Sequence, residues 1–185
     1  MTATATKLTY DDYVKLPDDG KRYEIIDGEL FVNPAPVPGH QLIVLTLAST
    51  LRAYCKERGG GKVLVSPIDV VFADDRIVQP DVVVILAARA SIVGKKNVQG
   101  RPHLVVEVLS DGTRRYDEIQ KRRLYESAGV EEYWVVDPEI ERVKIYRLSG
   151  GKYVLAAEID TDNGGNITSP LLPEFALPIA DVFAE

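Results

Sequence analysis

The pattern of apolar and polar residues along the chain predicts a mixed α/β fold that opens with a β-hairpin. Within residues 22–32, two apolar runs flank Asp27-Gly28, a dipeptide typical of the type I′ turn that joins hairpin strands. Over residues 40–58 the apolar residues recur at helical intervals, and the consecutive glycines that begin at Gly59 end this helix. A hairpin followed by one long helix is therefore expected in the first third of the chain.

Strand-like apolar runs follow this helix, and a second helix interrupts them. Residues 78–86 and 103–109 are nearly continuous in apolar residues, as in strands that are covered on both faces. The second helix is expected over residues 113–128, with Gly129 as its stop. The remaining predicted segments are strands at 62–72, 132–136, 142–148 and 153–159, a short helix with a basic loop at 87–102, a helical turn at 10–16, irregular chain at 33–39, and an apolar tail at 170–185 that packs on the body. This order predicts a mixed central β-sheet flanked by helices.

The composition indicates one folded domain over residues 1–185. Hydrophobic residues make up 45% of the chain, which excludes disorder over most of it. A single cysteine, Cys55, cannot form an intramolecular disulfide, so the disulfide-rich secreted class is excluded. No stretch approaches the ~18 apolar residues that a membrane span needs, and residues 1–10 lack the apolar run of a signal peptide. We expect a cytoplasmic protein without a membrane partner.

The charge of the chain limits how it could bind nucleic acid. Its formal net charge is −6, which argues against indiscriminate coating of nucleic acid. The total charge does not exclude a local basic groove, because it says nothing about where the charges lie. Basic residues do cluster in two segments, and they are Lys95, Lys96, Arg101, Arg114, Arg115, Arg122 and Arg123. Each of them could instead be an ordinary solvated residue of a loop or helix.

Two acidic residues lie inside apolar, strand-like runs. Asp81 follows Pro80 in the first run, and Glu107 interrupts the second. A buried carboxylate is unfavourable by several kcal/mol unless it is paired or bound to a cation. Two neighbouring strands with such residues suggest a shared divalent ion, and oxygen ligands select hard cations such as Mg²⁺ or Mn²⁺. Alternatively, each carboxylate caps a loop at a strand end or pairs with an arginine.

The second predicted helix brings a lysine toward the same place. Its apolar stripe runs through Leu124 and Ala128, and counting back by helical steps places Lys121 and Asp117 on that stripe. An Asp–Lys pair four residues apart is also an ordinary surface ion pair, worth ~0.2–0.5 kcal/mol. Combined with the two strand carboxylates, however, an inward lysine suits phosphodiester chemistry. A metal held by two acids can activate water, while the ammonium offsets charge on the phosphate.

Other kinds of site fit the sequence less well. Ser66 and Ser110 have no adjacent histidine and lie in no Gly-x-Ser-x-Gly turn. Two histidines, His40 and His103, with one cysteine do not suit a structural zinc site. Neither a phosphate-binding nor a dinucleotide-binding glycine motif is present. Trp134 alternates with its neighbours as a core strand residue does, so we expect it to pack in the core.

The order of these residues resembles the Uma-type restriction endonuclease family of the PD-(D/E)XK nuclease superfamily, once a domain of unknown function. The resemblance covers about residues 8–180. The matching segments are residues 22–30, His40, Gln79-Pro80-Asp81, residues 107–110, residues 114–121 and residues 128–138. The resemblance implies a restriction-endonuclease-like α/β fold, with the N-terminal hairpin beside the central sheet.

The resemblance also assigns roles to individual residues. Asp81 matches the aspartate of the PD motif and Glu107 matches the (D/E) position. The superfamily lysine should stand at position 109, where this chain has Leu109, and Lys121 in the following helix would take over its role. Glu24 matches the additional acidic residue of the N-terminal region. His40 either contributes to the site or is a helix cap or surface group.

The function implied by the resemblance is Mg²⁺-dependent hydrolysis of DNA, with Mn²⁺ as an alternative ion. Asp81, Glu107 and the Val108 carbonyl would hold the metal, and Lys121 would position the attacking water or stabilise charge on the phosphate. Cutting both strands would favour a homodimer. The alternative is a catalytically inactive binding or assembly module that keeps the nuclease fold, which Leu109 and the net charge of −6 favour.

Overall fold

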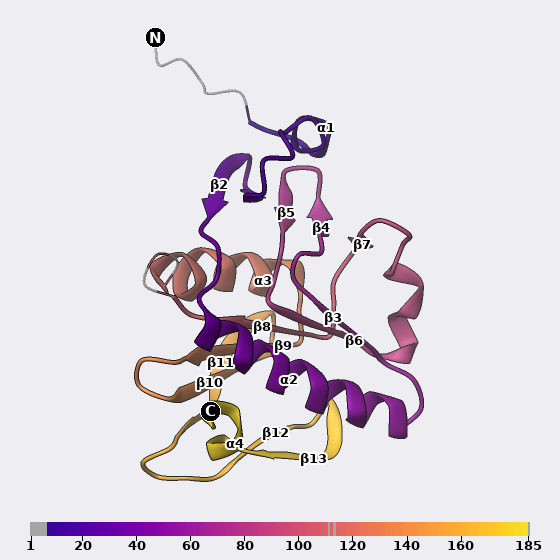
Figure 1. The fold of residues 1–185 in the computed structure, drawn as a ribbon. Coiled ribbons are helices and arrows are strands. Elements are labelled where there is room, and N and C mark those ends of the chain that lie inside the picture. The colour runs from indigo at the N-terminus through magenta and orange to yellow at the C-terminus, as the bar shows by residue number, and fades with distance from the viewer. Residues whose placement is uncertain (1–6, 111, 113, 185) are drawn as a thin grey trace.

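A six-stranded mixed sheet forms the centre of the computed structural model, which describes residues 7–110, 112 and 114–184. Its strand order is β11-β10-β9-β8-β6-β3, and every neighbouring pair is antiparallel except β8 and β9, which run parallel. The strands are β3 (Lys62–Val65), β6 (Val82–Ile85), β8 (Leu104–Val108), β9 (Glu132–Asp137), β10 (Arg142–Ser149) and β11 (Lys152–Asp160). The mixed central sheet predicted from the sequence is therefore confirmed (Figure 1).

A second sheet carries the N-terminal hairpin. Its order is β2-β1-β5-β4-β7, formed by β1 (Arg22–Ile26), β2 (Glu29–Asn33), β4 (Val70–Ala73), β5 (Arg76–Val78) and β7 (Val98–Gln99). Asp27 and Gly28, between β1 and β2, have φ values of 53° and 85°, as a type I′ turn requires at both central positions. The predicted hairpin and its turn are confirmed. A third, two-stranded sheet joins β12 (Asn166–Ser169) to β13 (Leu172–Pro178) near the C-terminus.

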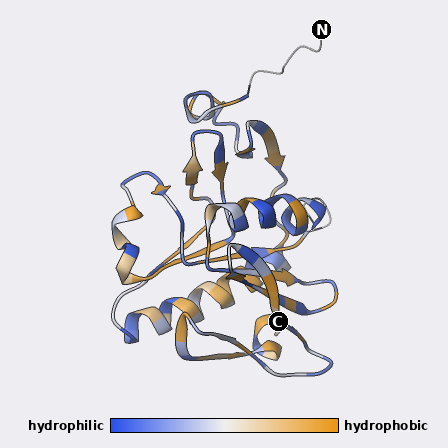
Figure 2. Cartoon of the chain, turned by 180° about the vertical axis from the view of Figure 1, so that it is seen from behind, coloured by the Kyte–Doolittle hydropathy of each residue, from blue (hydrophilic) through white to orange (hydrophobic). Residues whose placement is uncertain are grey.

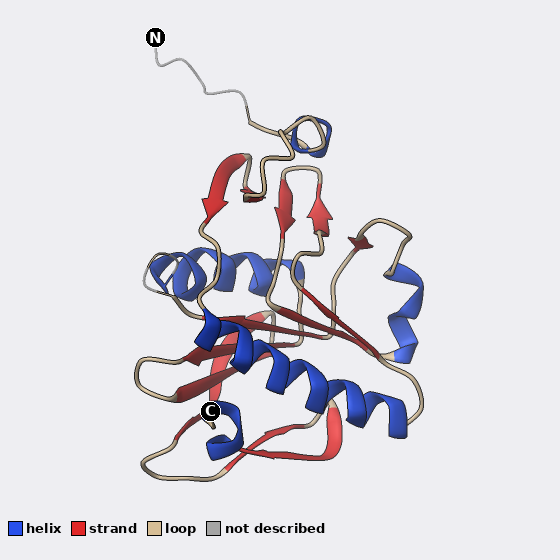
Figure 3. Ribbon diagram, in the orientation of Figure 1, coloured by secondary structure: helices blue, strands red, loops and turns tan. Residues whose placement is uncertain are grey.

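Helices lie on both faces of the central sheet (Figure 3). The helices of the described residues are α1 (Tyr10–Tyr13), which lies beside the second sheet, α2 (Pro38–Glu57), the 3₁₀-helix η1 (Ala87–Ile92), the π-helix η2 (Tyr116–Lys121), α3 (Arg122–Ala128) and α4 (Ile179–Phe183). Helix α2 packs on one face together with β13 and α4, and α3 packs on the other. Within the described residues, no helix is both long and apolar enough to cross a membrane.

The two faces of the central sheet have separate buried clusters. On β6, Val82 and Val84 belong to the cluster on the α2 side, whereas Val83 and Ile85 belong to the cluster on the α3 side. This alternation is the two-residue period of a strand that is covered on both faces. The central strands are accordingly apolar along their length (Figure 2). Trp134 is fully buried on the α2 side, as predicted.

Two predicted strands are each divided between the two sheets. The run at 62–72 splits into β3 and β4 around Pro67, and the run at 78–86 begins as β5 and resumes as β6 after Pro80. Proline has no N–H for a sheet ladder and ends strand pairing at both places. The prediction of continuous strands was wrong here. Asp81 consequently lies at the junction just before β6 and not inside a strand.

Both predicted helices are present, with changes at their ends. Helix α2 begins at Pro38, two residues before the predicted start, because proline suits the first turn of a helix, where its missing N–H needs no partner. The second helix ends at Gly129, which has a φ of 79° and is left-handed, as predicted for its stop. Its first half is the π-helix η2, which the sequence did not indicate, and Thr113 lies outside the described residues.

Candidate active site

A cavity of about 590 Å³ lies where the two sheets, the start of α2 and the start of η2 meet. Its walls come from the segment between β2 and α2, the start of β6, the end of β8, η2, and the C-terminal helix α4. The predicted site residues that line it are Asp81, Glu107, Val108, Lys121 and His40. Glu24 does not line the cavity, but it reaches the site through Lys121. The structure thus gathers residues from distant parts of the sequence around one opening.

Lys121 lies among three carboxylates, with 2% of its side chain exposed. Its Nζ is 3.0 Å from Glu107 Oε1, 3.1 Å from Glu24 Oε1 and 3.3 Å from Asp117 Oδ1. These partners come from β8, β1 and the same π-helix, respectively. The expected inward orientation of residues 117 and 121 is therefore observed, and the alternative of an exposed surface pair is wrong.

Burial and charge act in opposite directions on the two central groups. Burial alone would lower the pKa of Lys121, but Glu107, Glu24 and Asp117 together raise this pKa well above its usual value. Burial raises the pKa of Glu107 well above its usual value; Lys121 lowers it in part, and Asp117 and Asp81 add to the rise. Lys121 therefore remains an ammonium, which three carboxyl groups share among the described residues.

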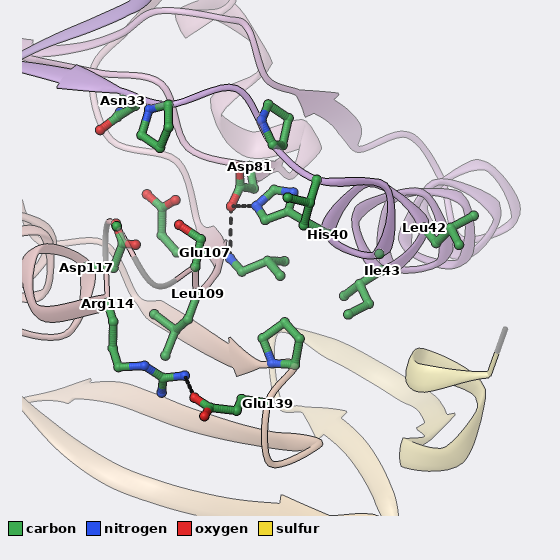
Figure 4. Close-up of a pocket in the computed structure, with 18 of the residues that line it drawn as sticks. Asn33, His40, Leu42, Ile43, Asp81, Glu107, Leu109, Arg114, Asp117 and Glu139 are labelled. Carbon is green, nitrogen blue, oxygen red and sulfur yellow. Dashed lines mark hydrogen bonds and ion pairs between the residues drawn. The ribbon is translucent and has the colours of Figure 1, made fainter.

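Asp81 is fixed by three donors at the edge of the cavity. Its Oδ2 accepts a hydrogen bond of 2.9 Å from the Val108 N–H and lies 3.1 Å from His40 Nε2 (Figure 4). Its Oδ1 is 3.6 Å from Arg22 Nη1. A carboxylate only accepts, so His40 Nε2 carries the proton in this contact. Burial opposes ionisation of Asp81, but the bond to His40, the charges of His40 and Lys121, and the Val108 N–H lower its pKa below the usual value.

His40 belongs to the site and not to the surface. Only 7% of it is exposed, and it makes no capping hydrogen bond at the start of α2. The alternative of a cap or surface group is therefore wrong. Its second ring nitrogen, Nδ1, is buried and has no hydrogen-bond partner among the described residues. His40 can therefore orient Asp81 through Nε2.

Two side chains and one backbone N–H, none of them predicted from the sequence as a site group, hold the acidic groups in place. Asn33 Nδ2 donates to Glu24 Oε2 at 2.7 Å, and the Gln79 N–H donates to Glu24 Oε1 at 2.6 Å. The Tyr125 hydroxyl donates to Glu107 Oε1 at 2.6 Å. Tyr125 follows Lys121 by four residues on the same helix face, a spacing that could have indicated it. For Asn33 and Gln79, the only indication in the sequence is their position: Asn33 directly follows the predicted hairpin, and Gln79 lies close to Asp81.

The π-helix determines how Asp117 and Lys121 face the site. The Arg122 N–H donates to the carbonyl oxygen of Asp117, five residues earlier, and the Tyr133 hydroxyl donates to the same oxygen at 3.1 Å. The wider turn leaves this carbonyl accessible to a side chain from β9. Single π-turns in otherwise α-helical segments frequently occur at functional sites.

Comparison with known proteins places this chain in a family. A model of the Uma2 family, described as "Putative restriction endonuclease", matches residues 10–180. The chain belongs to the Uma2 family. A solved structure from Anabaena variabilis, described as a putative nuclease belonging to DUF820, has a TM-score of 0.80 to this chain at 20% identity. That match covers 96% of this chain and 98% of the other, and it confirms the predicted fold. No curated protein matches.

In this Uma2 chain, position 109 has a structural role. The superfamily pattern predicted from the resemblance would have a lysine there, but Leu109 is 3% exposed and belongs to the apolar cluster on the α3 side. The ammonium near Glu107 comes instead from Lys121 of η2. The strand and the helix thus contribute different parts of the candidate site.

The donor set of the Uma2 site suits a hard divalent cation. Glu24, Asp81, Glu107 and Asp117 bring four carboxyl groups, whereas Lys121 and Arg22 supply the permanent positive charges that contact them. Among the residues that the structure describes, no group of three or more His, Cys, Asp or Glu side chains is placed to coordinate a metal ion. Mg²⁺ commonly binds through one or two carboxylates and keeps several waters, so a site with fewer protein ligands is chemically compatible with it. Asp81, Glu107 and the Val108 carbonyl are the groups that would hold it.

Proposed function

We propose that the protein is a Mg²⁺-dependent endonuclease that hydrolyses phosphodiester bonds of DNA, with Mn²⁺ able to replace Mg²⁺. The observation that supports this most directly is the buried ion pair between Lys121 and Glu107 at the wall of the cavity that also contains Asp81. DNA is the substrate suggested by the family description. The proposed reaction adds water across one P–O bond, so that one product end keeps the phosphate and the other becomes a hydroxyl.

Each polar residue of the site has a separate proposed task. When bound, the cation would lower the pKa of a water and neutralise phosphate charge. Lys121, which stays protonated, stabilises the negative charge that develops on the phosphoryl oxygens or positions the attacking water. Glu24 keeps the Lys121 ammonium directed toward Glu107. His40 holds the Asp81 carboxylate in one orientation.

A cleavage assay over several substrates tests this proposal. Supercoiled plasmid, linear duplex and single-stranded DNA are incubated with the protein and Mg²⁺, Mn²⁺ or EDTA. We expect cleavage that depends on the metal and that disappears in Asp81→Asn and Glu107→Gln. Glu174→Gln is the matched control, because it removes a carboxylate that is 70% exposed and lies outside the cavity. Metal-independent cleavage, or full activity in Glu107→Gln, would refute the assignment.

A catalytically inactive module with the same fold is the second candidate. The observation that favours it is Leu109, which stands where the superfamily pattern has a lysine. Calorimetric titration with Mg²⁺ and Mn²⁺ distinguishes the two. The enzyme proposal requires binding at millimolar concentrations or below that Asp81→Ala removes, whereas the inactive module requires neither binding nor cleavage.

We also propose that the protein works as a homodimer, since cutting both strands of a duplex is favoured by two sites related by a two-fold axis. Sedimentation velocity tests this. A species of twice the 20.4 kDa of one chain supports the proposal, and a monomer throughout the micromolar range refutes it.

A further inference from the structure

A second cavity of about 590 Å³ opens beside the candidate active site. We call it the β2–η2 groove and define it by Phe31 and Val32 of β2 and by Arg115, Tyr116, Ile119 and Arg123 of the helical segment that contains η2 and α3. None of these residues is a metal or water-activating group in the mechanism proposed above. The groove therefore needs an explanation of its own.

The groove adjoins the candidate site through two side chains. Asn33 lines both cavities, and its Nδ2 donates to Glu24. The ring of Tyr116, which lines the groove, lies 5.5 Å from Lys121 Nζ. A ligand that runs from the active-site cavity along the surface can therefore enter the groove without crossing the core.

One wall of the groove is aromatic and apolar. The rings of Phe31 and Tyr116 are 4.4 Å apart between centroids and tilted by 37°. Val32 and Ile119 beside them are 52% and 37% exposed. The Tyr116 hydroxyl is buried and has no hydrogen-bond partner among the described residues. Phe31 and Tyr116 are half-buried against the apolar cluster on the α3 side, and their exposed parts offer a surface on which another flat ring can stack.

The other wall carries two unpaired positive charges. Arg115, Ile119 and Arg123 follow one another at intervals of four residues, so they lie along one helix face. Arg115 and Arg123 are exposed, and neither forms an ion pair or hydrogen bond within the described part of the chain. The neighbouring Arg114, in contrast, is bound by Asp137 and Glu139. The free guanidinium groups thus lie at the groove and not at the acidic side of the site.

We propose that the β2–η2 groove binds an unpaired nucleotide of the DNA strand next to the bond that is cut, an inference that rests on the proposed function. The base stacks against the aromatic wall, and Arg115 and Arg123 contact the flanking phosphates. Single-strand binding sites commonly combine aromatic stacking with a positively charged track. In a duplex, the faces of the bases are covered by their neighbours, so an aromatic wall can be used only by an unpaired base. The favoured substrate class is therefore DNA with a single-stranded segment, such as a flap, gap or frayed end.

Binding measured without cleavage tests this inference. Fluorescence anisotropy with a labelled 12-nucleotide single strand, a blunt duplex of the same length and a flapped duplex is carried out in EDTA. We expect the single strand and the flap to bind more tightly than the blunt duplex. A 2-aminopurine in the strand should lose fluorescence on binding to the wild type, because stacking quenches it, and should keep it with Phe31→Leu. Phe31→Leu should bind the single strand at least about fivefold more weakly.

A double variant tests the charged wall. Arg115→Ala/Arg123→Ala should weaken single-strand binding and reduce the slope of log affinity against log salt by about 1.4, at about 0.7 for each lost phosphate contact. Arg52→Ala/Lys56→Ala is the control, because it removes two exposed positive charges of α2 that line neither cavity. Equal affinity and salt slope in both double variants would overturn the proposal, as would tighter binding of blunt duplex than of single strand.

The outcomes separate this inference from the proposed function. Metal-dependent cleavage of duplex DNA that the groove variants leave unchanged would overturn the groove proposal alone. Groove-dependent binding of single strands, together with no cleavage of any substrate, would refute the endonuclease and support the groove as a nucleic-acid site.

Discussion

Lys121 Nζ lies 3.0 Å from Glu107 Oε1, and both side chains are 2% exposed. The strand supplies the carboxylate, and the following π-helix returns the ammonium to it across fourteen residues of sequence. This buried pair joins the two halves of the candidate site, because Glu24 contacts the same ammonium and Asp81 lines the same cavity.

Replacing Lys121 should destabilise the protein as well as remove the proposed DNA cleavage. Lys121→Met keeps the length of the side chain but leaves Glu24, Glu107 and Asp117 without their shared positive charge. Breaking a buried pair in this way is unfavourable by about 3–5 kcal/mol. We expect a loss of this size in the free energy of unfolding, measured by urea denaturation. Lys152→Met removes an exposed partner of Glu126 and should change stability by less than about 1 kcal/mol. Equal effects of the two substitutions would contradict a buried pair.

The pH dependence of stability should reveal Glu107. Its pKa in the folded protein is raised above the usual 4.5, so above pH 4.5 the folded protein holds this proton more tightly than the unfolded chain does. Stability should therefore fall as pH rises from 4.5 toward the raised pKa, by at most about 1.4 kcal/mol per pH unit.

Other site groups should not obscure this change. The lowered pKa of Asp81 affects stability only below its usual 3.8, where stability falls as pH drops, and the raised pKa of Lys121 affects it only above 10.5. Glu107→Gln, which cannot ionise, should lack the decline. Denaturation of both proteins in EDTA between about pH 5 and pH 8 measures the difference. Parallel curves for wild type and Glu107→Gln would show that Glu107 does not titrate in this range.

Removing His40 should weaken metal binding without abolishing it. His40 orients Asp81 but is not one of the proposed ligands, and loss of such an outer partner commonly reduces metal affinity or activity by about 10- to 100-fold. We expect this reduction in Mg²⁺ affinity for His40→Ala by calorimetry, and complete loss for Asp81→Asn. His103→Gln is the control, because His103 accepts a hydrogen bond from the Leu86 N–H and does not line the cavity. An unchanged affinity in His40→Ala would exclude the orienting role.

Tyr13 of α1 should stabilise the segment that precedes Asp81. Its hydroxyl donates to Asp69 Oδ1 at 2.6 Å and accepts from Gln79 Nε2 at 3.1 Å, and Gln79 also binds Glu24. Tyr13→Phe should lower the free energy of unfolding by about 1.5–3 kcal/mol, as expected for a partly buried hydrogen bond to a charged group. The exposed bond from Tyr23 to Asp19 provides the comparison.

Tyr23→Phe removes the same kind of hydroxyl–carboxylate bond in water, so its effect should stay within about 0.5 kcal/mol. Thermal or urea unfolding measures both variants. If Tyr13→Phe were as mild as Tyr23→Phe, the network around Gln79 would not contribute to holding the site together.

The sequence predicted those parts of the fold that depend on local patterns. Asp27-Gly28 specified the hairpin turn, and Gly129 specified the end of the second helix, because both positions need a backbone with positive φ. The continuous apolar runs predicted strands buried on both faces. The division of two runs between two sheets was not predictable in the same way, because it depends on which strands are available to pair with each half.

The candidate site was predictable to a similar extent. Asp81, Glu107 and Lys121 were identifiable because each is a charged residue on an apolar strand or helix face. Their partners were not, since Asn33 meets Glu24 only when β1 and β2 pair, and Gln79 meets it only after the hairpin folds against β5. In the π-turn, the Asp117 carbonyl accepts a hydrogen bond from the Tyr133 hydroxyl of β9, and no local pattern of residues indicates this contact.

The ammonium group of the site belongs to Lys121 of η2 and not to a residue that follows β8, and this affects which positions are free to change during evolution. Because position 109, directly after β8, holds a leucine that packs in the core, the only groups that this strand has to supply to the site are Glu107 and the Val108 backbone. The proposed contacts of Arg115 and Arg123 lie on the helical segment, so substitutions at these two exposed positions leave the residues of the sheet unchanged.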